Sequence, residues 1–179
     1  MRLGYLGRID PLKGVDLLLR TLSGELAHRN WTLTLGGRGE PGYEGQLRAL
    51  FTDRRIRFLG FIRPADLLSK IDVLIIPSLW EEPFPRVLIE AHAHGVAVVG
   101  SNRGGIPEGI KQRQTGLIFD PDDPGSLACA IAMLLDDPQL VADMKAKAVA
   151  KAATAYTPAN ILSEYRSVYA AVLSGASRS

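Results

Sequence analysis

The stretch DVLIIPSLWEEPFPRVLIEAHAHGVAVVG, residues 72–100, decides the fold predicted for this chain. It predicts a strand at 72–77, a helix at 86–94 and a second strand at 96–100. Both strand segments carry apolar residues in succession, which is typical of strands buried on both faces. A strand, a helix and a strand in this order form the unit of a parallel sheet covered by helices.

The same alternation runs through the rest of the chain. Further strands are predicted at 2–7, 32–37, 56–60 and 116–119. Further helices are predicted at 15–27, 43–51, 64–71, 124–135 and 139–154. The predicted fold class is α/β, a Rossmann-like doubly wound parallel sheet of about six strands flanked by helices. Such folds bind ligands at the carboxyl ends of the strands, so the site is expected in the loops that follow them.

The length of 179 residues suits one domain, expected at 1–173. Its last helix is predicted at about 157–173, with a disordered tail at 174–179. A net charge of +2 without a basic stripe argues against nucleic acid as a partner. No apolar run could span a bilayer and no signal peptide is evident, so we expect a soluble, cytoplasmic protein. The lone Cys129 is expected in the core.

The segment EPFPRVLIE, residues 82–90, places two carboxylates around a predicted helix start at Pro85. The free N–H groups and positive pole of a helix start suit a phosphate, and flanking carboxylates suit the hydroxyls of a sugar. A sugar nucleotide combines both groups. The plainer alternative pairs Arg86 with Glu90 on the helix surface and lets Glu82 complement the helix pole.

The segment GRIDPLKG follows the first predicted strand and brings Arg8 and Lys13 to the expected site. An arginine and a lysine could clamp a diphosphate and stabilise its charge as it leaves. In the alternative, both are solvated loop charges, and Asp10 caps a helix that begins at Pro11. Two glycine-rich loops, at 37–42 and 104–105, are explained equally well as ligand loops or as turns before helices.

The run DPDD, residues 120–123, has the spacing of carboxylates that hold a metal-bound diphosphate. We interpret Asp122 and Asp123 instead as caps of a helix that begins near Pro124. His92 and His94 lie two positions apart, which places them on different faces of a helix and argues against joint metal binding. No metal or other cofactor is expected.

Taken together, the motifs GRIDPLKG, LGGRGE, IRFLGFI, EEPFPRVLIEA, GGIPE and TGLIFDPDDPGSL make a recognisable set. The chain resembles the C-terminal, donor-binding half of retaining glycosyltransferases of the GT-B fold, family four. The resemblance covers nearly the whole chain and implies a metal-independent transferase that uses a nucleotide-diphosphate sugar as donor.

The resemblance also implies roles for individual residues. Arg8 and Lys13, next to Gly7, match the cationic pair on the donor diphosphate. Glu90 matches the glutamate that binds the ribose, and Glu82 matches the one that faces the transferred sugar. Backbone groups of Phe84, Pro85, Arg86 and Val87 would line the sugar and phosphate of the donor. Phe61 and Ile62 would lie near the base.

This chain departs from the family pattern at Pro83 and Pro85, where many members have glycine. Proline lacks the N–H that could contact the donor. Arg86 would supply another hydrogen-bond donor or change the sugar preference. Unchanged donor affinity and sugar choice in Arg86→Ala would contradict this hypothesis.

Family members place the donor half after an N-terminal acceptor-binding domain, and the resemblance implies that this chain corresponds to the donor half with the N-terminal domain absent. The isolated domain is therefore expected to bind the donor without efficient transfer. Peripheral membrane association through the missing half, and self-association through the apolar face of the last helix, are further expectations.

Two other classes stay open. A nucleotide-sugar epimerase or a sugar-phosphate synthase would share the fold, and a nucleotide-binding domain without catalysis would bind but never turn over. A nicotinamide-dependent dehydrogenase is disfavoured because the first strand-to-helix turn lacks Gly-x-Gly-x-x-Gly. The motifs do not define the base, the sugar or the acceptor.

Overall fold

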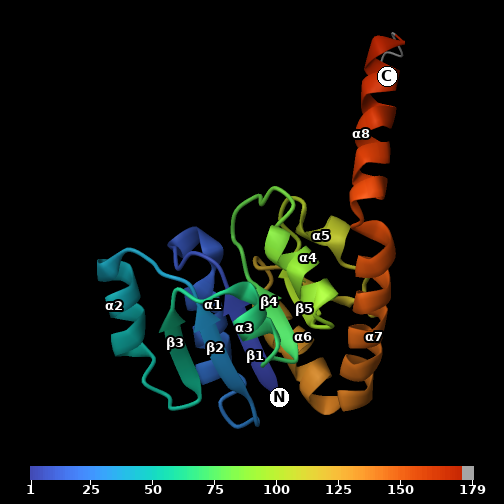
Figure 1. Ribbon diagram of the computed structural model, residues 1–179. Coiled ribbons are helices and arrows are strands. Elements are labelled where there is room, and N and C mark those ends of the chain that lie inside the picture. Colours follow the sequence, from blue (N-terminus) through green and yellow to red (C-terminus); the bar gives the residue numbers. More distant parts are fainter. Residues whose placement is uncertain (175–179) are drawn as a thin grey trace.

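The computed structural model describes residues 1–174, so nearly all of the predicted tail at 174–179 lies outside the described residues. A six-stranded parallel sheet in the order β3-β2-β1-β4-β5-β6 forms the centre of the molecule (Figure 1). Its strands are β1 (Arg2–Leu6), β2 (Thr32–Gly36), β3 (Ile56–Gly60), β4 (Val73–Ile76), β5 (Ala97–Ser101) and β6 (Gly116–Phe119). The fold class predicted from the sequence is confirmed.

Helices cover both faces of the sheet. They are the short 3-10 helix η1 (Pro11–Lys13) and the α-helices α1 (Val15–Ser23), α2 (Pro41–Leu50), α3 (Pro64–Leu68), α4 (Arg86–Ala93), α5 (Ile106–Gly109), α6 (Ser126–Asp136), α7 (Pro138–Ala155) and α8 (Pro158–Leu173). Residues of α1 and α6 pack in one apolar core, and residues of α3, α4 and α5 pack in the other. The chain is therefore doubly wound.

Every residue of the central strand β4 is apolar because both faces of this strand are buried. Val73 and Ile75 belong to the core on the α1 and α6 face, whereas Leu74 and Ile76 belong to the core on the α4 face. Full burial of such a side chain contributes about 1.5–3 kcal/mol to stability. A strand between two helical layers therefore needs the unbroken apolar run that the sequence displays.

The strand order reverses between β1 and β4, which are parallel neighbours. The connection after β1 leads to one face of the sheet and the connection after β4 leads to the other. The two loops therefore diverge at the carboxyl ends of these strands. Leu79 N donates a hydrogen bond of 2.8 Å to Leu12 O and joins these loops. Gly14 fits beside them because its φ is +68° and a Cβ there would lie 1.8 Å from Pro77 O.

Two predictions for the segment after β6 are wrong. Cys129 is exposed, because α6 buries Leu127, Ala128 and Ile131 and turns position 129 to solvent. Asp122 and Asp123 do not cap α6, which begins at Ser126 after Gly125 and has no side-chain cap.

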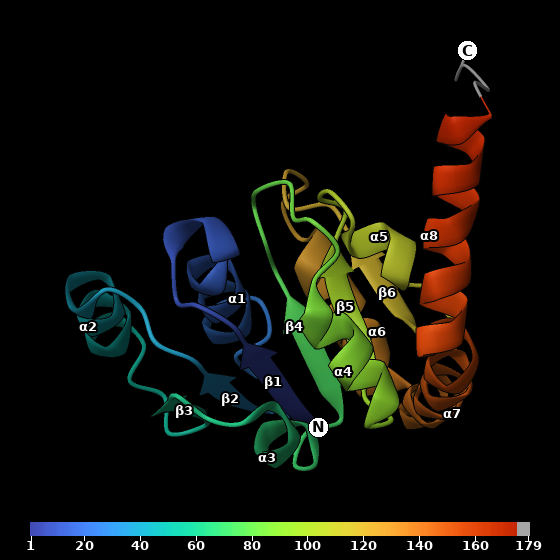
Figure 2. The same ribbon diagram turned by 45° about the horizontal axis from the view of Figure 1, so that its top comes forward.

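The helix α8 lies outside both cores. Each of its residues is exposed, and the helix extends past the sheet edge that carries the loops after β1 and β4 (Figure 2). Its predicted apolar stripe is present and uncovered, with Leu162 at 56% and Tyr169 at 64% exposure. Among the described residues, no helix is long and apolar enough to cross a membrane.

His92 and His94 point to different environments, as their spacing predicts. His92 is fully buried in α4 and stacks on Tyr156, with ring centroids 6.3 Å apart. Burial, assisted by the nearby charge of Lys151, lowers the pKa of His92 to about 4. His94 is exposed, with Nδ1 2.8 Å from Glu90 O.

The fit of Gly14 predicts that Gly14→Ala destabilises the protein. The left-handed backbone and the overlap with Pro77 O should lower the free energy of unfolding by at least about 2 kcal/mol. Gly45→Ala is the matched control, since nothing lies within 4 Å of a Cβ at this exposed position of α2. It should raise stability by about 0.5–1 kcal/mol. Urea unfolding measures both, and equal effects would contradict the account.

The buried His92 predicts a loss of stability in mild acid. The pKa of this histidine is about 6.5 in the unfolded chain and about 4 in the folded protein, so the unfolded chain binds the proton at a higher pH. Stability therefore falls as pH falls through this window, by about 2 kcal/mol between pH 7 and pH 5. Urea unfolding of His92→Leu should lack this loss and His94→Gln should keep it. The same pH dependence in both variants would rule out His92 as its source.

Candidate functional site

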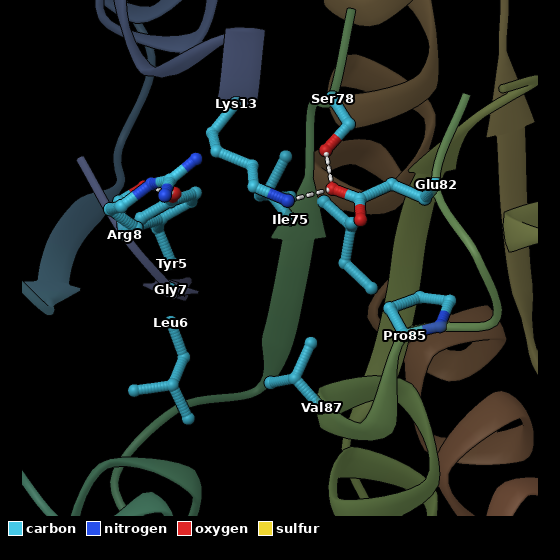
Figure 3. A pocket seen from close by; sticks show the side chains of 11 residues that line it. Tyr5, Leu6, Gly7, Arg8, Lys13, Ile75, Ser78, Glu82, Pro85 and Val87 are labelled. Carbon is cyan, nitrogen blue, oxygen red and sulfur yellow. Dashed lines mark hydrogen bonds and ion pairs between the residues drawn. The ribbon is translucent and has the colours of Figure 1, made fainter. Parts of the chain in front are cut away.

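A cavity of about 420 Å³ opens at the carboxyl ends of β1 and β4, where the strand order reverses (Figure 3). Residues from the loop after β1, the loop after β4 and the start of α4 line it. They are Tyr5, Leu6, Gly7, Arg8, Lys13, Ile75, Ile76, Ser78, Glu82, Pro85 and Val87. Both predicted cations and one predicted glutamate therefore meet in one place.

Arg8 lies at the open side of this cavity. Tyr5 donates a hydrogen bond of 2.5 Å to Arg8 O and fixes the backbone of the loop. Burial, together with the charge of Glu82, raises the pKa of Tyr5, so its hydroxyl keeps the proton that it donates. The side chain of Arg8 is 68% exposed, and its guanidinium lies 3.3 Å from Asp10. An exposed ion pair of this kind is weak, so the guanidinium is available to an anionic ligand.

Glu82 lies on the opposite wall and is nearly buried. Its Oε1 accepts a hydrogen bond of 2.6 Å from Ser78 Oγ and forms an ion pair with Lys13 Nζ. Burial alone raises the pKa of Glu82. Hydrogen bonds from Lys13 and Ser78 outweigh that effect, so the pKa of this carboxyl lies below its usual value. Glu82 is therefore a carboxylate at neutral pH, with its second oxygen directed toward the side of Pro85 (Figure 3).

The glycine-rich loop at 104–105 braces the backbone around Glu82. Gly105 N donates to Glu82 O at 2.7 Å, and Gly104 N donates to Glu81 Oε2 at 2.5 Å. A Cβ at Gly104 would lie 2.1 Å from Glu82 O, so only glycine allows this approach. The loop is therefore a support for the Glu82 loop and does not line the cavity.

The start of α4 completes the wall. Pro85 precedes the helix in an extended conformation, and Leu88 N makes the first hydrogen bond back to Pro85 O at 3.0 Å. The N–H groups of Arg86 and Val87 lie ahead of that bond and have no carbonyl within the helix. They give this end of the cavity a partial positive charge.

Five predicted positions lie outside the cavity lining. Phe84 packs edge-to-face on Tyr156, with centroids 6.1 Å apart, and Ile62 packs against the core beside α4. Phe61 is 79% exposed in the loop after β3. Arg86 is exposed and Glu90 half-buried on α4. Among the ion pairs of the described residues none joins Arg86 to Glu90, so the alternative surface pair does not form.

The structure adds Ser78 and Tyr5 to the residues selected from the sequence. Ser78 is buried beside Glu82. Its position in the same loop after a strand, four residues before the glutamate, could have indicated this contact from the sequence. Tyr5 sits within a strand pattern, so nothing local marked its hydroxyl as the partner of Arg8 O.

Within residues 1–174, no three His, Cys, Asp or Glu side chains are grouped so that they could hold a metal ion. The acidic run instead binds Arg103, whose guanidinium lies 2.5 Å from Asp122 and 3.7 Å from Asp120.

The fold and the cavity define the class of protein. A doubly wound parallel sheet with a cation-lined cavity where the strand order reverses is the architecture of a nucleotide-binding α/β domain. The family model described as "Glycosyl transferases group 1" matches residues 1–137. The chain belongs to this family, which confirms the resemblance seen in its motifs.

Relatives and solved structures agree with this assignment. The D-inositol 3-phosphate glycosyltransferase 2 of Catenulispora acidiphila is 34% identical over 164 residues, covering 83% of this chain and 38% of that protein. The glycogen synthase of Mycobacterium tuberculosis is 36% identical over 140 residues, covering 75% and 34%. The crystal structure of Anabaena HepE in complex with UDP-glucose has a TM-score of 0.81 at 27% identity, covering 95% and 48%. The chain thus spans less than half the length of these proteins.

Proposed function

We propose that this chain is the donor-binding domain of a retaining, metal-independent glycosyltransferase. The observation that carries the proposal is the meeting of Arg8, Lys13 and Glu82 around one cavity where the strand order reverses. Two cations and a helix start suit a diphosphate, and a fixed carboxylate suits sugar hydroxyls.

In this proposal, Arg8, Lys13 and the N–H groups at the start of α4 bind the diphosphate. Each charged hydrogen bond would contribute about 1.5–3 kcal/mol. The same groups would stabilise the charge that develops on the leaving diphosphate, which is the work a metal ion does elsewhere. This supports transfer without a metal.

The other contacts follow from family membership. Glu82 would accept a hydrogen bond from the transferred sugar, Glu90 would bind the ribose, and Phe61 and Ile62 would lie near the base. UDP-glucose, the ligand of HepE, is the first donor to test. The acceptor site would come from the N-terminal half that the longer relatives possess, so this domain alone should bind donor without efficient transfer. Cytoplasmic location and membrane association through that half stay predictions.

Calorimetry with UDP-, GDP- and ADP-glucose tests the site. One of these donors should bind the wild-type domain, and Arg8→Ala should weaken it by about 10- to 100-fold because a charged hydrogen bond is lost. Glu90→Ala should weaken it as well through the ribose. Arg54→Ala is the matched control and should bind the donor as the wild type does. Arg54 is an exposed arginine before β3, at the amino ends of the strands and away from the cavity.

Failure of every donor to bind, or unaltered binding in both site variants, would overturn the site assignment. The same panel on Arg86→Ala tests whether this arginine affects sugar choice. An epimerase or synthase would be revealed by its products in the full-length protein, and a non-catalytic domain by binding without turnover when the N-terminal half is restored.

A further inference from the structure

Lys13 is engaged by the loop after β4 from two sides. Its ammonium forms an ion pair with Glu82 and lies 5.2 Å from the ring centroid of Trp80. The side chains of Lys13 and Glu82 are only 21% and 9% exposed, so the pair is poorly solvated. The cation assigned to the diphosphate is therefore neutralised by the glutamate assigned to the sugar.

Three alternate residues of one loop create this arrangement. Ser78 donates to Glu82 Oε1 at 2.6 Å, Trp80 presents its ring to the ammonium, and Glu82 supplies the counter-charge. A carboxylate that is nearly buried needs compensation when its cation leaves. The Ser78 bond alone does not replace a full positive charge.

We propose that Glu82 and the donor diphosphate share Lys13, and that the transferred sugar decides which of them holds it. When a complete donor is bound, a sugar hydroxyl donates to Glu82 and compensates it, so Lys13 turns to the diphosphate. After transfer the hydroxyl is gone, and Glu82 takes Lys13 back. The nucleoside diphosphate product then loses one of its two cations and leaves.

This inference rests on the proposed function and deepens it. It assigns the loop segment of Ser78, Trp80 and Glu82 a role in distinguishing the donor from the nucleoside diphosphate product. The physical basis is competition between two anions for one cation, together with repulsion between the carboxylate and the diphosphate. Both effects weaken product binding, and both depend on the charge of Glu82.

Calorimetry with UDP, GDP and ADP, and with their glucose esters, tests the proposal. Glu82→Gln keeps the shape and the Ser78 bond but removes the charge, so it frees Lys13. The diphosphate that binds the wild type most tightly should bind this variant at least about fivefold more tightly. Its glucose ester should gain less or lose affinity, because the contact of Glu82 with the sugar is weakened.

A double-mutant cycle identifies Lys13 as the shared group. In a Lys13→Gln background, Glu82→Gln should produce less than half of the tightening measured with Lys13 present. Glu81→Gln is the charge control, since the neighbouring carboxylate binds Gly104 N instead. It should tighten diphosphate binding less than Glu82→Gln does. Glu82→Asp keeps the charge but withdraws it from Lys13, so it should tighten diphosphate binding less than Glu82→Gln does, and it serves if the latter fails to fold.

Unchanged or weaker diphosphate binding in both Glu82 variants would overturn the inference while leaving donor binding intact. Equal tightening in Glu81→Gln, or full tightening without Lys13, would overturn it as well by showing a general charge effect. Absence of binding by the wild type to all six ligands would overturn the proposed function, and the inference with it.

Discussion

The pairing of β1 with β4 is the constraint on which the rest of the site depends. It places Lys13 beside Glu82, although 69 residues separate them in the chain. The hydrogen bond from Leu79 N to Leu12 O and the close fit of Gly14 against Pro77 O hold the two loops in that position. Without this pair of strands the cations and the carboxylate would belong to unrelated surfaces.

The Glu82 loop is the second part of the construction, since it has no regular secondary structure of its own. Gly105 N donates to Glu82 O, and Gly104 N donates to the carboxylate of Glu81. The buried carboxylate of Glu82 is bonded to Ser78 and Lys13. Prolines at 83 and 85 restrict the chain further. A ligand group placed on such a loop is held by several independent contacts, which is what precise orientation of a sugar requires.

Periodicity and strand-end reasoning were sufficient for the fold, because two-sided burial leaves an unmistakable apolar run in β4. They also made Arg8, Lys13 and Glu82 candidates, since residues after parallel strands share one edge, and the resemblance to the family assigned them to the donor. They did not indicate that Lys13 pairs with Glu82 or that Gly104 supports its loop, because these contacts join segments far apart in the chain. Cys129 was misplaced because an apolar helix pattern does not define its orientation when almost every position is apolar.

A crystal structure of this chain with the nucleotide sugar that binds it most tightly would show whether Arg8, Lys13 and Glu82 form the donor site. We expect diphosphate oxygens within hydrogen-bond distance of both Arg8 and Lys13, at the start of α4, with a sugar hydroxyl on Glu82. A diphosphate bound away from the loops after β1 and β4, or a Lys13 still paired with Glu82 while the sugar is in place, would contradict it.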